Sequence, residues 1–401
     1  MKAMKLLAAA LGVAALVGSA SAQPWPGVTD GEIRLGNTAP YSGPVSAYGI
    51  IARAASAYFD KVNAEGGVNG RQIKLISYDD AYSPPRTLEQ TRRLVERDGV
   101  AAIFMPIGTA PSSAIHAYLN GKKVPMLYVG GGARKFNNPS QYPWTMGWQP
   151  SFETEGAILS RYALENQPDA KIGVIYQNDD FGKDLLEGVM IGLGDKAEAV
   201  LIARETYETT DPTIDSQLSN LRAAGANVLI GLTSPKQTAQ SIRGVAALDW
   251  KPMQLYYQNA ASVEQTLRPA GLENAEGILT AVYLKDPADP RWADDQEMKD
   301  YKAFTETYMQ GLNGMDVLAA YGYACAATMV EVLKAAGDDL SRENIMRQAT
   351  SMQNVSIPML YPGITLSNSA EDFRLIRQMQ LMKFNGGSFE PAGALSGGSE
   401  D

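Results

Sequence analysis

Few residues of this 401-residue chain have side chains that could perform catalysis or bind a metal ion. The chain contains one histidine, His116, and one cysteine, Cys325. Metal sites and most acid–base machinery use clusters of His and Cys, and a single Cys allows no internal disulfide. Acid pairs stand at positions 79–80 and 179–180, but adjacent acids point in different directions and often cap helices. The sequence therefore predicts no enzyme, no metal site and no cofactor.

Two further kinds of partner are disfavoured by motif and charge. Three consecutive glycines, 130–132, follow an apolar run and could approach a ligand closely, but they lack the spacing of a dinucleotide-binding or Walker-type loop. The formal net charge of the chain is -9. Because phosphates would be repelled by this charge, a nucleic-acid partner is not expected.

The first residues have the pattern of a secretory leader. Lys2 and Lys5 precede an apolar run over 6–17, and Ala20-Ser21-Ala22 supplies the small residues of a cleavage site. The apolar run is shorter than the roughly 20 residues that a membrane span needs. We expect a signal peptide over 1–22, cleaved after Ala22, and a mature protein that is soluble outside the cytoplasm.

Short apolar runs alternate with amphipathic helical runs along most of the chain, and this rhythm restarts after Trp148. Repeated alternation predicts parallel sheets covered by helices on both faces, in an α/β fold. The number of strands favours two doubly wound lobes, whose ligands bind beyond the carboxyl ends of the strands. The expected strands cover 33–37, 72–78, 101–107, 124–129, 171–177, 199–206, 228–233 and 253–257.

Three segments resemble one known family. They are 36–44 (GNTAPYSGP) followed by Tyr48-Gly49, 62–71 (VNAEGGVNGR) leading into Tyr78-Asp79-Asp80, and 177–183 (QNDDFGK). Together they resemble the leucine/isoleucine/valine-binding type of periplasmic binding protein, over nearly all of the mature chain. The resemblance implies the type I fold, with two Rossmann-like lobes joined by a three-stranded hinge. It implies lobe one at 24–149 and 278–356, lobe two at 150–277 and 357–392, and a flexible tail at 393–401.

The same resemblance implies which loops contact the ligand. Small-residue loops suit this task, because their backbone N–H groups can face a carboxylate without obstruction. The implied contacts are Tyr48, Thr109, Ala110, Pro111, Gly132, Ala133 and Arg134 in lobe one, Phe181, Thr233 and Asn259 in lobe two, and Trp148 in the connecting loop.

Three of these positions depart from the amino-acid binders of the family. Those binders have Thr at the position of Arg134, Tyr at that of Phe181, and near Asn259 an acid that holds the ligand's ammonium. A buried ammonium without a counter-charge is costly, whereas Arg134 could hold a carboxylate through two hydrogen bonds. We therefore expect an aromatic or apolar carboxylate without an amino group, and the chain also resembles the branch that imports aromatic acids. Two alternatives stay open: Arg134 as a solvated rim charge, and Tyr257 or Gln258 in place of Asn259.

The resemblance implies a periplasmic, monomeric solute-binding component of an ABC importer, with an inner-membrane permease as its partner. A branched-chain amino acid or an amide is the alternative ligand. A ligand-sensing module for a membrane receptor and a secreted carboxylate-dependent enzyme are the alternative functions.

Overall fold

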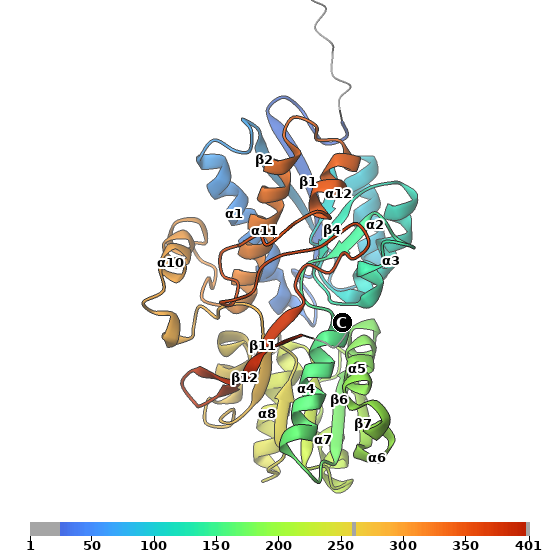
Figure 1. Cartoon of the computed structure of the whole chain (residues 1–401), viewed down its shortest axis with the longest axis vertical. Helices are drawn as coiled ribbons and strands as arrows, with labels where there is room; N and C mark the ends of the chain where they lie inside the picture. Colours follow the sequence, from blue (N-terminus) through green and yellow to red (C-terminus); the bar gives the residue numbers. More distant parts are fainter. Residues whose placement is uncertain (1–24, 259–261, 398–401) are drawn as a thin grey trace, which may run out of the picture.

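The computed structural model describes residues 25–258 and 262–397. The expected signal peptide and Asn259 lie outside the described residues. Figure 1 shows two α/β lobes, one above the other, with a separate sheet in each. The expected α/β class with two doubly wound lobes is confirmed.

Lobe one contains a five-stranded sheet of order β2-β1-β3-β4-β5, in which every pair is parallel. Strands β3, β4 and β5 are fully buried and β1 is mostly buried, in keeping with a sheet covered by helices on both faces, whereas the edge strand β2 is largely half-buried. Helices α2 and α3 pack against each other, and α1 packs against the long helix α11 (Val317–Ala336). The elements are β1 (Glu32–Ala39), α1 (Gly49–Ala64), β2 (Gln72–Asp79), α2 (Pro84–Glu96), β3 (Ala102–Phe104), α3 (Thr109–Gly121), β4 (Met126–Val129) and β5 (Thr145–Gly147).

Helices from later in the chain complete lobe one: α10 (Gln296–Tyr308), α11 (Val317–Ala336) and α12 (Arg342–Ala349). Helix α11 is long and apolar enough to cross a membrane, but 89% of that segment is buried inside the fold. It approaches α1 closely at Gly322, where an added Cβ would lie 2.0 Å from the carbonyl oxygen of Ile51. Cys325 is buried in the same helix, as a small core residue.

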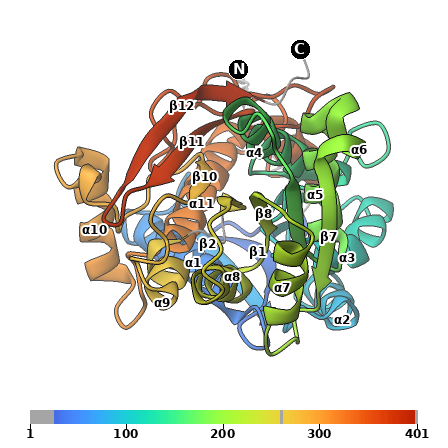
Figure 2. The same ribbon diagram turned by 90° about the horizontal axis from the view of Figure 1, so that it is seen from below.

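Lobe two contains a seven-stranded sheet of order β12-β11-β10-β9-β8-β6-β7. The strands from β7 to β10 are parallel, and the β10–β11 and β11–β12 pairs are antiparallel. Helices α4 and α5 lie on one side of this sheet, and α7 and α8 lie on the other (Figure 2). The elements are α4 (Phe152–Asn166), β6 (Ile172–Gln177), α5 (Asp180–Leu193), α6 (Ala197–Val200), β7 (Leu201–Tyr207), α7 (Asp215–Ala223), β8 (Val228–Leu232), α8 (Pro235–Ala247), β9 (Met253–Tyr256), α9 (Arg268–Ala270), β10 (Leu279–Val282), β11 (Gln378–Phe384) and β12 (Phe389–Gly397).

The described chain passes between the lobes in three places: between β5 and α4, between β10 and α10, and between α12 and β11. Two expected boundaries differ from the structure. Strand β10 pairs with β9 and β11 in lobe two, so the return to lobe one comes after Val282 and not at 278. Residues 393–397 belong to β12, which pairs with β11, so this part of the expected tail is a strand.

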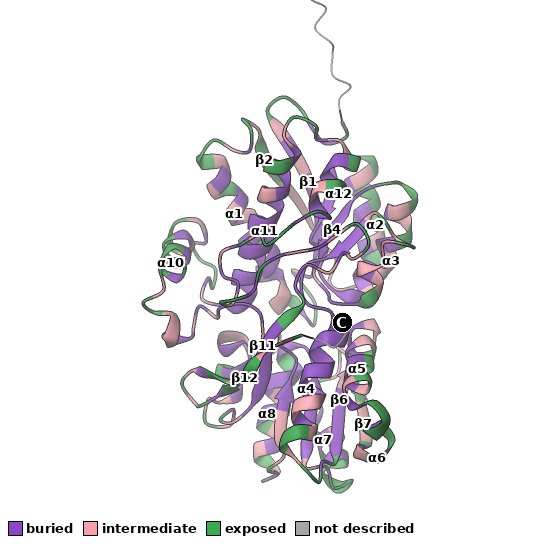
Figure 3. Cartoon of the chain, in the orientation of Figure 1, coloured by how far each residue is buried: buried purple, intermediate pink, exposed green. Residues whose placement is uncertain are grey.

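Burial follows the layered architecture. In Figure 3 the strands are mostly buried, while exposed residues gather on outer loops and helix faces. Strand β8 is buried at all five positions, as expected for the centre of a sheet covered on both faces. Residues at or just after the carboxyl ends of β3, β4, β6 and β9 meet in the space between the lobes.

Candidate functional site

A cavity lies between the two lobes, where several parallel strands end. Its volume is about 30 Å³, within a recess that has about 440 Å³ of unoccupied space. A cavity of that volume holds one or two waters, so a larger solute has to enter while the lobes are apart. The lining residues are Val45, Tyr48, Ile51, Tyr82, Ile107, Gly108, Thr109, Gly130, Gly131, Gln149, Phe152, Gln177, Phe181, Tyr257 and Tyr321.

The beginning of α3 forms one polar part of the wall. Gly108 precedes the helix with φ 101°, a conformation that favours glycine, and Thr109 is its first residue. The first N–H groups of a helix have no acceptor inside the helix. The N–H groups of Thr109 and Ala110 have no backbone acceptor among the described residues. This end of α3 can therefore donate hydrogen bonds to an anion, with the helix dipole adding to the attraction.

Tyr82 reaches the cavity from a constrained turn after β2. Ala81 and Tyr82 both have left-handed backbones, with φ of 50° and 60°. Their N–H groups donate to the side chains of Asp79 and Asp80 at 3.0 and 2.9 Å. Asp80 also accepts a hydrogen bond from Thr87 Oγ1 at 2.9 Å. The acid pair that the sequence displays at 79–80 is thus a turn-forming device.

Aromatic rings of lobe two form an edge-to-face cluster on the opposite wall. Phe181 lies 5.4 Å from Phe152 and 5.1 Å from Tyr257, measured between ring centroids. Phe152 and Tyr257 are 5.8 Å apart. Rings at these distances and angles attract one another beyond their burial. The cluster presents apolar ring faces and edges to a solute.

Amide and hydroxyl groups connect the cavity to the hinge. Gln149, next to the first crossover, donates from Nε2 to the hydroxyl of Tyr257 at 3.0 Å. The hydroxyl of Tyr321, on α11, donates to Oε1 of the same glutamine at 3.3 Å. Gln149 therefore joins a lobe-one ring to a lobe-two ring, and a change in the lobe angle must disturb this pair of bonds.

No Lys, Arg, His, Asp or Glu lines the cavity in the part of the chain that the structure describes. A buried acid, Glu155, and a half-buried acid, Asp179, lie just behind the wall. Glu155, in the first turn of α4, accepts the N–H of Gln258 at 2.6 Å, and burial raises its pKa to about 8. Burial also raises the pKa of Asp179, against the opposing effect of hydrogen bonds from Gln177 and the Gly182 backbone. Ionising either group has a free-energy cost unless a cation or donor approaches.

Three of the residues expected to contact the ligand line the cavity: Tyr48, Thr109 and Phe181. Four others occupy the same loops but do not line it: Ala110, Pro111, Gly132 and Ala133. Gly132 shows the reason, since an added Cβ would lie 2.6 Å from the Pro150 carbonyl oxygen. Its surroundings are filled by the first crossover.

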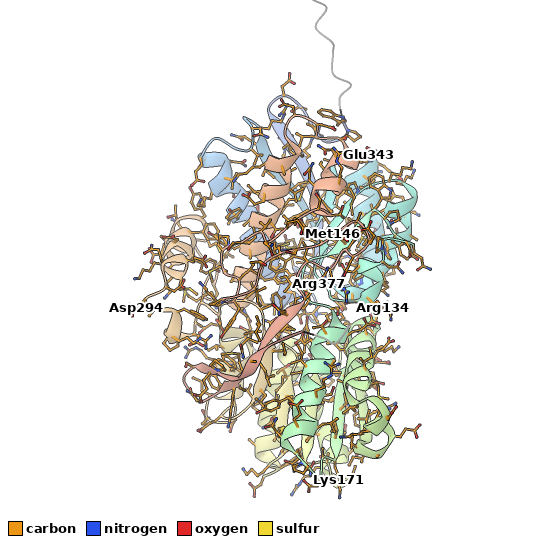
Figure 4. All side chains as sticks on the ribbon, viewed as in Figure 1. Arg134, Met146, Lys171, Asp294, Glu343 and Arg377 are labelled. Atoms are coloured by element: carbon orange, nitrogen blue, oxygen red, sulfur yellow. The ribbon has the colours of Figure 1, made fainter. Side chains whose placement is uncertain are left out.

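Arg134 does not line the cavity. Its side chain is 74% exposed and pairs with Glu153 at 3.2 Å. Figure 4 places Arg134 at the level where the lobes meet, on the outside of the molecule. The expected two-bond contact between Arg134 and a ligand carboxylate is therefore replaced by an ion pair between the lobes.

Trp148 and Thr233 are fully buried away from the cavity. The indole N–H of Trp148 donates to Thr328 Oγ1 at 2.9 Å, which fixes the ring against α11. Thr233 is hydrogen-bonded to Thr238 at 2.6 Å, at the start of α8. Tyr257, one of the two alternatives to Asn259, lines the cavity.

Several lining residues were not expected from the sequence. Gln177 stands at the end of a predicted strand, and Phe152 follows the restart of the alternation, so position along the chain was a usable signal for both. Tyr321 sits in an Ala-rich helix far along the chain and gave no such signal. The lining residues with aromatic or amide side chains that the sequence did not identify as ligand contacts are Tyr82, Gln149, Phe152, Gln177 and Tyr321. Within the described ranges, no group of three or more His, Cys, Asp or Glu residues could hold a metal ion.

Comparison with known proteins identifies relatives over most of the chain. A model of the periplasmic binding protein family matches residues 32–388. An "Amino acid binding protein" of Pseudomonas aeruginosa is 22% identical over 316 residues, which is 76% of this chain and 79% of that protein. The "Leu/Ile/Val-binding protein homolog 1" of Brucella abortus is 24% identical over 324 residues, 78% of this chain and 81% of that protein. These relatives are solute-binding proteins and not enzymes.

Solved structures share the fold at low sequence identity. A branched-chain amino acid ABC transporter protein from Thermus thermophilus with bound valine has a TM-score of 0.82 at 16% identity, covering 92% of this chain and 97% of that one. A fatty acid ABC transporter substrate-binding protein from Thermomonospora curvata has a TM-score of 0.77 at 20% identity, covering 94% and 95%. The family match, the two-lobed fold and the cavity between the lobes lead to one conclusion: this chain belongs to the periplasmic binding protein family.

Proposed function

We propose that this protein is the periplasmic solute-binding component of an ABC importer and that it captures a small carboxylate with an aromatic or otherwise flat apolar body. The observation that carries the proposal is the lining of the cavity between the lobes. Six aromatic rings contribute to it, together with the beginning of α3, and no charged side chain does so among the described residues.

The two ends of such a solute suit different parts of the wall. A carboxylate at Thr109 would accept hydrogen bonds from the N–H groups of Thr109 and Ala110 in the first turn of α3. Hydrogen bonds to a charged acceptor are stronger than those between neutral groups. A ring would pack against Phe152, Phe181 and Tyr257. Because these groups come from both lobes, the solute gains contacts on closure and shifts the population towards the closed form.

Calorimetric titration with a matched pair of solutes tests the ligand class. 3-Phenylpropionate and phenylalanine share the ring and the carboxylate, and differ in the ammonium group. We expect 3-phenylpropionate and benzoate to bind more tightly than phenylalanine or leucine. Tight binding of leucine with no response to either aromatic acid would refute the aromatic carboxylate.

Two variants at one position test the anion site. Thr109→Pro removes the N–H at a helix position where proline is tolerated, whereas Thr109→Val removes the hydroxyl and keeps the N–H. We expect Thr109→Pro to weaken carboxylate binding about tenfold or more, the loss of one hydrogen bond to a charged group, and Thr109→Val to have a smaller effect.

Stimulation of the permease ATPase by the solute-loaded protein would separate import from sensing.

An α-amino acid is a second candidate ligand, and Glu155 is the observation that favours it. This buried carboxyl group lies directly behind Tyr257 and has no cationic partner among the described residues. A ligand ammonium close to it would be stabilised by the negative charge. If phenylalanine binds more tightly than 3-phenylpropionate and Glu155→Gln abolishes that preference, the amino acid is the ligand.

A further inference from the structure

A direct hydrogen bond joins the lobes beside the cavity. The hydroxyl of Tyr82, in lobe one, donates to Asp179 Oδ2, in lobe two, at 3.1 Å. Gln177 Nε2 donates to the same carboxylate oxygen at 2.6 Å and approaches the Tyr82 hydroxyl at 3.4 Å. Tyr82 also lines the cavity, so the same side chain forms part of the cavity wall and bonds to the opposite lobe.

Both partners of this bond are held in place by their own lobes. The turn that carries Tyr82 is left-handed at two consecutive non-glycine residues, a conformation that persists when the surroundings enforce it. Asp179 caps α5 through its other oxygen, which accepts the N–H groups of Phe181 and Gly182 at 3.0 and 3.3 Å. The backbone of Tyr82 and the carboxylate of Asp179 are thus each positioned within their own lobe, so the bond between them depends directly on the position of one lobe against the other.

The neighbouring acid makes a second connection between the lobes. Asp180 Oδ2 accepts hydrogen bonds from Lys135 Nζ at 2.6 Å and from Ser113 Oγ at 2.9 Å, and both donors belong to lobe one. The side chains of Lys135 and Asp180 are 35% and 44% exposed, so salt screens this pair. The acid pair at 179–180 thus holds lobe one at two adjacent points.

We propose that Tyr82 is the latch of this binding protein: its hydroxyl bond to Asp179 stabilises the closed arrangement of the lobes whatever solute the cavity holds. Opening breaks this bond and exposes both groups to water. The latch sets the fraction of molecules that are closed before a solute binds, and it slows release afterwards. This role goes beyond the identity of the solute and would survive a revision of the ligand class.

The test uses Tyr82→Phe, which keeps the ring in the cavity wall and removes the hydroxyl. Tyr78→Phe is the matched control, because the Tyr78 hydroxyl donates to Asp98 at 3.0 Å entirely within lobe one. Spin labels on cysteines at the exposed positions Glu89, on α2, and Glu187, on α5, measure the distance between the lobes. The protein is unfolded, dialysed and refolded first, so that no solute is carried over.

We expect Tyr82→Phe to raise the ratio of open to closed molecules by about tenfold, the effect of one lost hydrogen bond to a charged group, and Tyr78→Phe to match the parent protein. Lys135→Ala provides an independent variant: it should also favour the open form, and 1 M salt should open the parent more than this variant. The proposal is overturned if Tyr82→Phe retains the distance distribution of the parent, whatever Lys135→Ala does, or if Tyr78→Phe opens the protein to the same extent as Tyr82→Phe.

Discussion

Replacing Glu155 by glutamine should stabilise the protein, and the gain should grow as the pH rises from 5 to 8.5. The Glu155 side chain is buried in the first turn of α4 and accepts the N–H of Gln258. Glutamine has nearly the same shape, and its carbonyl oxygen can accept the same hydrogen bond. The substitution therefore removes the ionisable group and keeps the contact.

The magnitude follows from the pKa of this group. Burial raises it from 4.5 to about 8. The folded protein holds a proton that the unfolded chain releases, so folding stability is lost as the pH rises from the unfolded value towards the folded one. Each pKa unit corresponds to about 1.4 kcal/mol. Between pH 5 and pH 8.5 the stability difference between variant and wild type should widen by about 4 kcal/mol and then remain constant.

Urea unfolding at a series of pH values measures this difference. Glu165→Gln is the control, because Glu165 lies on the same helix with an exposed side chain. Its stability difference from wild type should stay nearly flat over the same range. A Glu155→Gln difference that is constant from pH 5 to 8.5 would refute the reasoning, since it would mean that the carboxylate ionises in the folded protein without cost.

Three other variants test separate parts of the structure. Gly322→Ala should destabilise the protein by about 2 kcal/mol, since the new methyl group would meet the Ile51 carbonyl, while Gly121→Ala, where nothing lies within 4 Å, should be nearly neutral in thermal unfolding. Burial lowers the pKa of His116 from 6.5 to about 4, so stability should fall as the pH falls through this range, and His116→Phe should flatten that part of the urea profile. Arg134→Gln should leave the affinity for 3-phenylpropionate within about twofold in calorimetry, because the guanidinium is exposed and its ion pair is weak; a tenfold loss would place it in the binding site.

The strands of the two parallel sheets could be predicted because local patterns determine them. Apolar runs such as 228–232 are buried on both faces, and every predicted strand from 33–37 to 253–257 corresponds to an observed one. Strands β5, β10, β11 and β12 were not predicted. Strand β10 pairs with β11, which comes from beyond the long return through lobe one. Strand β12 only extends the sheet from β11, and the three-residue β5 adds to the edge of β4. Such pairing leaves little trace in a local pattern.

The residues of the candidate site also fall into two groups, those whose place at the cavity follows from their position along the chain and those for which it does not. Tyr48, Thr109 and Phe181 stand at or just before the starts of helices that follow strands, and these helix starts lie at the cavity. Arg134 stands in a loop of the same kind, yet its side chain extends outward to Glu153. A loop's position fixes where its backbone lies, but the direction of a long side chain depends on which partners are near. Tyr321 reaches the cavity from a core helix whose sequence predicts burial alone.

The sequence by itself predicted a two-lobed α/β fold, since this property depends on the local periodicity of apolar residues and on the number of strands that it implies. Only the tertiary structure shows how the two lobes meet. In the tertiary structure the acid pair at 79–80 supports a turn, and the pair at 179–180 connects the lobes. Glu155 is buried there, so ionising its side chain has a free-energy cost. Burial and contact across the lobes are properties of groups distant in the chain, and no local pattern encodes them.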